Sequence, residues 1–277
     1  QVPVLTGQTF SGWKTADGAD APLGQPVTAD LTLSGTYTSQ PGTTSFDNAL
    51  TKLLDGDASG LVDGALPISN IADFASFVSR AEEVPAGQLV RLQNNIDLGE
   101  NIYSAISDFK GDFDGDNHII SGGTFTAVGD NAGMFAKLGA YNGRGQRVGN
   151  LKLSGGTVNA SGADYAGIRV GKAGGTETSS DKFVQIQNMQ GTGGSVSGRS
   201  AGGIAGLIHW TTVQYCTVDG TEVSATINGG GIAGISYRNI VNCGATVTAT
   251  AIPLFGKVGG IVGKNLEASY IDCCWKP

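Results

Sequence analysis

The amino-acid sequence predicts a mainly β protein, a parallel β-helix (β-solenoid) with a helical cap at its N-terminal end. Glycine makes up 45 of the 277 residues, without the strict triplet period of collagen. Helix-forming residues are diluted by glycine, threonine, serine and valine, which favours short strands joined by turns. A glycine signature repeats along the second half of the chain, and one amphipathic helical pattern precedes the repeats. These observations together indicate stacked β units that a helix closes at one end.

The repeat unit is a glycine–apolar–small signature followed by a short strand pattern. It occurs five times, as AGMFA, AGIRVG, GGIAG, GGIAG and GGIVG, with anchor glycines 34, 36, 28 and 29 residues apart. These anchors are Gly133, Gly167, Gly203, Gly231 and Gly260. A unit of about 30 residues that cannot bury its own apolar side must stack on its neighbours. We therefore expect successive parallel rungs over 132–274.

Two columns of matching residues support this register. One is predicted to point into the core in successive rungs: Leu151, Met189, Cys216, Cys243 and Cys273. The residues immediately before them are predicted to form a second column at a turn or outer face: Asn150, Asn188, Tyr215, Asn242 and Asp272. In-register parallel strands aim their Cβ atoms alike, which is a poor geometry for a disulfide. The cysteines are therefore expected to stack as free thiols, with a disulfide as the alternative.

The segment before the repeats contains the predicted cap. Phe74, Phe77 and Val78 recur at helical spacing, which predicts a helix over 70–82 that buries them against the first rung. Two strand patterns follow, at 88–99 and 109–123, the second interrupted by a turn. Residues 41–65 are rich in glycine, aspartate, serine and threonine, and are predicted to be a connector with a short helix over 46–54.

The motifs of 66–277 resemble a known family. The order of a helix, then IDLG, then FKGDFDGDNHIISG, then GGI(A/V)G units with a following NC resembles bacterial surface proteins with GLUG repeats. This resemblance implies a secreted or surface-attached protein of the adhesin type. Some GLUG repeats also lie beside protease domains, so a stalk or accessory segment of a larger surface protease is an alternative.

The N-terminal segment carries a second resemblance. Phe10, the pair Gly12–Trp13 and the run 27–33 are similar to the Listeria–Bacteroides repeat of surface proteins. The resemblance implies a small, partial β-grasp-like segment over 1–40, followed by the connector 41–65 and the helix-capped solenoid 66–277. Because the chain starts at Gln1 without an initiator methionine or signal peptide, it is expected to be a trimmed piece of a longer protein.

Charge is unevenly distributed along the chain. Residues 1–130 hold 17 acids and 5 bases, whereas 131–277 hold 7 acids and 12 bases, within an overall net charge of −7. The acidic half argues against a general nucleic-acid binder. The basic half would suit an anionic partner, although two solvated surfaces of different composition explain the split equally simply. The apolar runs are too short to suggest a membrane span.

The candidate chemical motifs are few, and no cofactor is expected. Asp112, Asp114 and Asp116 alternate as calcium ligands do, but the glycine is misplaced for an EF-hand loop, so a structural turn is the expected role. His118 and His209, the only histidines, do not have metal-ligand spacing. Some β-helices are polysaccharide lyases or hydrolases, but the repeat acids share no register here. The chain is therefore expected not to be an enzyme, with a carbohydrate-active enzyme as the alternative.

The expected function is the binding of a glycan or protein on a host or neighbouring cell. Loops at one corner of successive rungs would place aromatic and basic side chains along one ridge. The ridge residues are Tyr141, Arg144, Trp210, Tyr237 and Arg238. Aromatic rings stack on the apolar faces of sugars, and arginine forks hold carboxylates or sulfates. The alternative is that Trp210 and Tyr237 only pack against each other between rungs.

Overall fold

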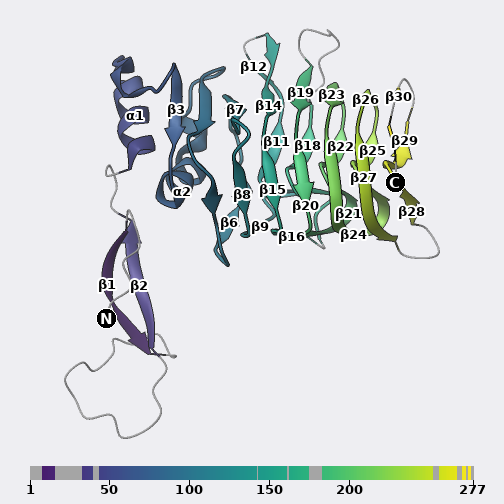
Figure 1. Ribbon diagram of the computed structural model, residues 1–277, viewed down its shortest axis with the longest axis horizontal. Helices are drawn as coiled ribbons and strands as arrows, with labels where there is room; N and C mark the ends of the chain where they lie inside the picture. The colour runs from purple at the N-terminus through teal and green to yellow at the C-terminus, as the bar shows by residue number, and fades with distance from the viewer. Residues whose placement is uncertain are drawn as a thin grey trace, which may run out of the picture.

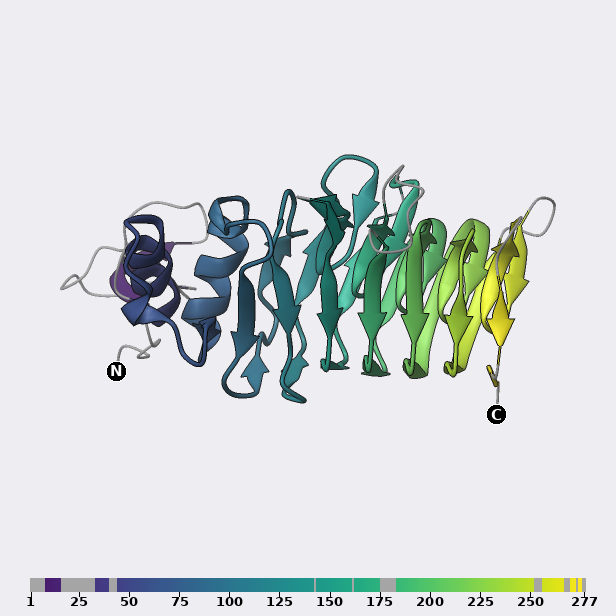
Figure 2. The same cartoon turned by 90° about the horizontal axis from the view of Figure 1, so that it is seen from above.

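A computed structural model describes residues 8–15, 33–39, 44–141, 143–160, 162–174, 183–251, 256–266, 270–272 and 274–275. The protein is mainly β, with a curled array of parallel strands that follows two short helices (Figure 1). Successive segments of the chain lie side by side along the length of the array, as Figure 2 shows from above. None of the helices in the described ranges is long and apolar enough to cross a membrane.

The N-terminal segment forms a two-stranded antiparallel sheet. Strand β1 (Gln8–Thr15) pairs with β2 (Leu33–Ser39), and the pairing shifts between Phe10 and Gly12, as at a β-bulge. Most of the predicted strand run over 27–33 lies outside the described residues. The pairing joins the two ends of the segment that resembles the Listeria–Bacteroides repeat.

Two helices close the first end of the array. Helix α1 (Ser45–Leu54) is capped by Thr44, and α2 (Ile71–Arg80) by Asn70, whose side chain accepts from the backbone N–H of Ala72 and of Asp73. Short 3₁₀ turns follow the helices, η1 (Ala58–Gly60) and η2 (Ala81–Glu83). The predicted helix over 70–82 is confirmed with ends one or two residues shorter. The segment predicted to be a connector contributes α1, whose Phe46 and Leu50 are fully buried in the same core.

Aromatic rings join the cap to the first turns of the array. Phe77 of α2 lies 5.3 Å from Phe109 and 5.7 Å from Phe113, measured between ring centroids. Phe74 lies 5.4 Å from Tyr103 in an edge-to-face arrangement. Phe74 and Phe77 are fully buried, and Val78 packs half-buried against the same cluster, as predicted. The cap therefore covers apolar surface that the first strands would otherwise expose to water.

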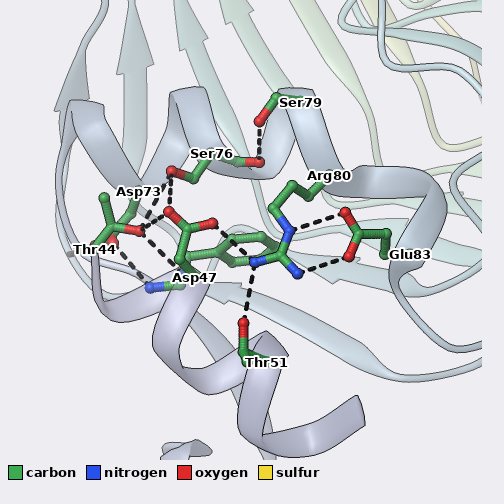
Figure 3. A network of polar contacts seen from close by, with 9 residues as sticks. Thr44, Asp47, Thr51, Asp73, Ser76, Ser79, Arg80 and Glu83 are labelled. Atoms are coloured by element: carbon green, nitrogen blue, oxygen red, sulfur yellow. Dashed lines mark hydrogen bonds and ion pairs between the residues drawn. The ribbon is translucent and has the colours of Figure 1, made fainter. Parts of the chain in front are cut away.

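A polar network fixes the two cap helices to each other (Figure 3). The buried carboxylate of Asp73 in α2 accepts from the backbone N–H of Phe46 at 2.9 Å and from the hydroxyl of Ser45 at 2.6 Å. Asp47 of α1 in turn accepts from Ser76 at 2.8 Å and pairs with Arg80 at 3.2 Å. Asp73 of α2 thus holds the N-terminal end of α1, and Asp47 of α1 holds side chains of α2. Both carboxylates are hydrogen-bonded, which strengthens the contact between the helices.

Within the described residues, three parallel sheets form the array. The first has eight strands, in the order β3 (Ala65–Ile68), β4 (Leu89–Leu92), β7 (Asp112–Asp114), β14 (Arg147–Gly149), β19 (Val184–Gln187), β23 (Thr211–Gln214), β26 (Ile240–Val241) and β30 (Ile271–Asp272). The second has five, in the order β11 (Phe135–Leu138), β18 (Val170–Ala173), β22 (Ala205–Ile208), β25 (Ala233–Ser236) and β29 (Val262–Asn265).

The third sheet has thirteen strands among the described residues, of which β24 is the longest. Its members are β5 (Ile96–Asp97), β6 (Ile102–Ser104), β8 (Ile119–Ser121), β9 (Thr124–Thr126), β10 (Asn131–Ala132), β15 (Lys152–Ser154), β16 (Thr157–Asn159), β17 (Tyr165–Gly167), β20 (Gln190–Thr192), β21 (Ser195–Gly202), β24 (Thr217–Gly230), β27 (Gly244–Ala251) and β28 (Lys257–Gly259). A small antiparallel hairpin, β12 (Ala140–Tyr141) and β13 (Arg144–Gly145), stands apart from them.

The predicted inward column is confirmed for the residues that the structure describes. Leu151, Met189, Cys216 and Cys243 are all fully buried. Backbone hydrogen bonds link the strands that follow them from one turn to the next, for example Thr217 N–H to the Met189 carbonyl at 2.8 Å. Cys273 lies outside the described residues.

The second predicted column is a row of left-handed turns. Asn150, Asn188, Tyr215 and Asn242 have φ values of 51°, 52°, 56° and 52°. Asparagine tolerates this region better than most residues, which explains why it recurs there. The Asn188 amide also donates to the Asn150 side-chain oxygen at 3.0 Å, so neighbouring turns are joined by side chains. Asp272, predicted as the next member, lies in β30.

The repeated glycines lie where strands of two sheets meet backbone to backbone. A methyl group on Gly206 of β22 would collide with the backbone nitrogen of Ala166 in β17. One on Gly234 of β25 would come within 2.7 Å of the nitrogen of Ala201 in β21. Only glycine permits so close an approach, and this accounts for the last glycine of the signature.

Candidate functional site

Aromatic and basic side chains gather at one corner of three successive turns. Phe183 precedes β19, His209 and Trp210 precede β23, and Tyr237 and Arg238 precede β26. Because Val184 pairs with Thr211, the residues before them are neighbours across the sheet. These five residues are called the aromatic corner below.

The centre of the aromatic corner is a stacked guanidinium. The Cζ atom of Arg238 lies 3.7 Å from the centroid of the Trp210 ring and 5.7 Å from that of Phe183. The His209 ring connects the two ends of the cluster, at 5.2 Å from Trp210 and 5.1 Å from Tyr237. Phe183 and Trp210 are themselves 5.6 Å apart. The guanidinium is thus oriented by aromatic faces, a contact worth about 0.5–2 kcal/mol.

The aromatic corner remains open to water on part of its surface. Tyr237 is 37 % exposed, whereas His209, Trp210 and Arg238 are half-buried. Nε of Arg238 is buried without a hydrogen-bond partner among the described residues. Ser236 fixes the backbone beneath it, since its hydroxyl donates to the Arg238 carbonyl at 2.7 Å. An oriented arginine beside a partly exposed ring can hold a carboxylate, a sulfate or the face of a sugar.

The structure places Tyr141 and Arg144 in the β12–β13 hairpin, where they are cross-strand partners. Nη2 of Arg144 pairs with the Asp112 carboxylate at 2.6 Å and approaches the Gly87 carbonyl at 3.4 Å. Tyr141 is half-buried, and this burial raises the pKa of its phenol. Of the five predicted ridge residues, Trp210, Tyr237 and Arg238 therefore lie together, while Arg144 turns toward an earlier strand.

The hairpin nevertheless borders the aromatic corner. Gln146, which is buried, fixes its base by donating to the carbonyls of Phe109 and Gly111, both at 2.8 Å. The backbone of Gly145 then touches that of Phe183, so closely that any side chain on Gly145 would collide with it. The hairpin therefore lies next to Phe183, on the side opposite to Trp210.

The carboxylates of the alternating aspartates are held by protein groups. Asp112 pairs with Arg144 and also accepts from the backbone N–H of Arg147 at 2.9 Å. Asp114 pairs with Arg91 at 3.3 Å and accepts from the Asn150 amide at 3.0 Å. Asp116 is exposed and adopts a φ of 46° in the turn. A cation at this place would have to displace arginines, and the arrangement is that of an ion-paired turn.

Other reactive groups are dispersed in the part of the chain that the structure describes. No three or more histidine, cysteine, aspartate or glutamate side chains there are grouped so as to hold a metal ion. His118 lies 3.3 Å from the Asn95 side-chain oxygen. The described cysteines, Cys216, Cys243 and Cys274, are free thiols. The neighbouring thiol of Cys216 and burial hold the pKa of Cys243 well above its usual range, so Cys243 is an inert thiol at neutral pH.

The sequence reasoning missed Phe183 and the bridging position of His209. A signal for Phe183 was available, because VQIQN and TTVQY are equivalent strand patterns and the residue before each, Phe183 or Trp210, lies at the corner. Nothing in the sequence shows that the His209 ring lies between Trp210 and Tyr237.

The fold of this chain resembles that of a solved structure. No protein-family model and no curated protein sequence matches the chain. A solved structure that resembles it is that of "a putative immunoglobulin A1 protease from Bacteroides ovatus". The two chains superpose with a TM-score of 0.59 and 22 % sequence identity, over 76 % of this chain and 75 % of the other. At this identity the similarity concerns the fold alone.

Proposed function

We propose that this chain is a non-catalytic β-solenoid of a secreted bacterial surface protein, which binds a glycan or protein on a host or neighbouring cell. The observation that carries the proposal is the stacking of Arg238 on Trp210 at 3.7 Å beside the exposed ring of Tyr237. A surface that only needed to be stable would not require a half-buried guanidinium whose Nε has no hydrogen-bond partner in the described part of the chain. The resemblance to GLUG-repeat proteins supports the cell-surface setting.

The test is binding of the purified chain to a printed array of host glycans and to immobilised collagen and fibronectin. Trp210→Asn removes the ring and suits the left-handed backbone, since Trp210 has a φ of 51°. Arg238→Gln removes the charge. We expect each variant to weaken binding by about tenfold or more, as for a central interface arginine or tryptophan.

The matched control is Tyr215→Asn. Tyr215 is 56 % exposed, also has a left-handed φ, and lies outside the aromatic corner. We expect this variant to bind like the wild type. Unchanged binding by folded Trp210→Asn and Arg238→Gln would contradict the proposal.

A second function is favoured by the similarity to the Bacteroides ovatus structure, which extends over 76 % of this chain and 75 % of the other. On this alternative the chain is a substrate-docking segment of a larger surface protease. Incubation with immunoglobulin A1 separates the alternatives: retention of the antibody without cleavage fragments supports a docking segment. Fragments produced by this chain alone would contradict every non-catalytic assignment.

A further inference from the structure

A pocket of about 230 Å³ opens beside β25, whose Ile235 lines it two residues before Tyr237 of the aromatic corner. It lies between β17, β21 and β24 on one side and β25 on the other. The residues that line it and matter here are Asp164, Tyr165, Arg199, Ser200, Asn228 and Ile235. The two rows of residues that line it continue along the sheets in both directions, and the band between these rows is called the groove below.

One wall of the groove is a row of register partners in the third sheet. Tyr165 pairs with Ser200, Ser200 with Asn228, and Asn228 with Lys257. Paired residues on parallel strands point to the same face of the sheet. Because the first three line the pocket, Lys257 faces the same side, one strand further along.

The other wall is a row in the second sheet. Ile235, which lines the pocket, pairs with Lys264 on one side and with Leu207 on the other. Leu207 pairs with Lys172, which pairs with Lys137. The Nζ atom of Lys172 lies 5.8 Å above the Tyr165 ring of the opposite wall, and so confirms that the two rows face each other.

The groove is basic at both ends. Lys137 and Lys172 lie at one end, Lys257 and Lys264 at the other, and within the described residues none of the four has a carboxylate partner. Strands about 4.8 Å apart spread the row from Lys137 to Lys264 over roughly 19 Å. The acid at the pocket, Asp164, is already paired with Arg199 at 3.0 Å.

The floor between the charged ends is polar but uncharged. Asn228 and Ser200 are each only 4 % exposed, and the Asn228 amide donates to the Ser200 hydroxyl at 3.1 Å. This leaves the Asn228 oxygen and the Ser200 hydroxyl hydrogen available to a ligand. Burial raises the pKa of Tyr165, so its phenol remains a donor at neutral pH.

We propose that this groove binds an acidic polysaccharide, in which carboxylate or sulfate groups meet the lysines and the hydroxyl-rich sugar rings lie over Tyr165, Ser200 and Asn228. A ligand that carries both anionic groups and many hydroxyls matches four lysines separated by uncharged polar and apolar groups. Nucleic acid, which offers few free hydroxyls to the polar floor, is also disfavoured by the net charge of −7 of the whole chain. The aromatic corner borders the groove, because Tyr237 follows Ile235 by two residues, but the inference uses none of its five residues.

The experiment is titration of the full chain with two polymers. Polygalacturonate carries carboxylates alone, and chondroitin sulfate carries both carboxylates and sulfates. We expect binding that weakens as NaCl is raised from about 50 mM to about 300 mM, because exposed charge pairs are screened. The double variant Lys172→Gln/Lys264→Gln should lose about tenfold in affinity or more, through lost contacts and lost counterion release. Asn228→Ala should weaken binding without changing the salt dependence.

The matched control is Lys52→Gln/Lys152→Gln, which removes the same charge from α1 and β15, outside the groove. We expect the control to bind within about twofold of the wild type, because its two lysines are distant from the groove and screened.

The proposal is overturned if the wild type binds neither polymer at low salt, or if the control variant loses as much affinity as the groove variant. It is also overturned if neutral dextran or poly-L-glutamate binds as tightly as the acidic polysaccharides, because the site would then recognise neutral sugars or acidic protein. The variant Trp210→Asn is expected to bind these polymers as tightly as the wild type. It therefore distinguishes binding in the groove from binding at the aromatic corner.

Discussion

Arg169 donates from Nη1 to the carbonyl oxygen of Gly203 over 2.6 Å, although its whole side chain is buried. Nε and Nη2 of the same guanidinium have no hydrogen-bond partner among the described residues. Burial lowers the pKa of Arg169 to about 10, and the group therefore still carries its charge at neutral pH. Gly167 pairs with Gly202 and Val170 with Ala205, so Arg169 occupies the core position that Ile204 and Ile232 hold in the next two units.

We predict that Arg169→Met stabilises the protein. A buried charge with unsatisfied nitrogens is costly, and replacement by an apolar side chain of similar size removes that cost. The expected gain is about 1–4 kcal/mol in the free energy of unfolding, the range seen for replaced buried ion pairs. It is measured by denaturant unfolding at pH 7.

The control for this prediction is Arg199→Met, because Arg199 is 57 % exposed in an ion pair with Asp164. Its unfolding free energy should change by less than about 1 kcal/mol. A loss of stability in Arg169→Met would mean that the guanidinium organises the core around Gly203 and Gly191, whose backbone it touches.

Much of the fold was predictable because the repeat fixes the register. Once the strand patterns that follow the glycine signatures are aligned, Leu151, Met189, Cys216 and Cys243 fall into one column, and the structure buries all four. The helix over 70–82 was predictable because its own apolar spacing encodes it. The burial of Arg169 was not, since a charged residue is unexpected at a core position that isoleucine, Ile204 and Ile232, holds in the next two units.

The candidate site was predictable only in part. Trp210, Tyr237 and Arg238 could be placed together because each lies six or seven residues after the anchor glycine of its own unit, Gly203 or Gly231. The engagement of Arg144 with Asp112 depends on a contact between residues 32 positions apart, in a loop whose length no other unit shares. Local sequence patterns carry no information on such a pairing.

The second prediction concerns the cap. Phe74 is fully buried against Tyr103 and Phe125, so Phe74→Ala leaves a cavity and should cost about 3–5 kcal/mol in unfolding free energy. Phe74→Asp should give insoluble or unfolded protein, because it places a charge where the cap covers the first turns. Leu54→Ala, at a position 49 % exposed on α1, is the control and should change stability by less than about 0.5 kcal/mol. Wild-type thermal stability in Phe74→Ala would show that α2 is not a cap.

The third prediction is a pH dependence. Arg80 and Glu83 form two hydrogen bonds, of 2.9 Å and 2.6 Å, and these hold the pKa of Glu83 below its usual value. Their contribution is therefore complete above the pKa of Glu83 in the unfolded chain, and is lost as pH falls through the lower pKa of the folded state. Since Glu83 is 40 % exposed, Glu83→Gln should cost less than about 1 kcal/mol at pH 7.

The measurement is the difference in unfolding free energy between wild type and Glu83→Gln, followed from pH 7 downward. The difference should shrink with acidification, because the wild-type carboxylate becomes protonated and loses the pair. Glu82→Gln, one residue away and exposed, should show no such convergence. A constant difference across the range would assign the effect of Glu83→Gln to packing instead of charge.

The fourth prediction uses the row of left-handed turns. Asn188 has a φ of 52° and donates to Asn150, so Asn188→Ala loses both a tolerated backbone conformation and a side-chain bond. It should cost about 1–2 kcal/mol from the backbone alone. Asn188→Gly relieves the backbone strain but not the lost bond, and should fall between Asn188→Ala and the wild type.

Tyr215 occupies the same row with a φ of 56° and is 56 % exposed, so its ring is held in a strained turn with little burial in return. Replacing it with the residue found at 150, 188 and 242 should therefore stabilise the fold: Tyr215→Asn is expected to gain a few tenths of a kcal/mol to about 1 kcal/mol. Tyr215→Ala keeps the strain and loses the ring, and should be less stable than the wild type. Thermal unfolding of the two variants decides the matter. If Tyr215→Asn proves no more stable than Tyr215→Ala, backbone conformation is not what selects asparagine in this row, and the side-chain bonds between turns must account for it.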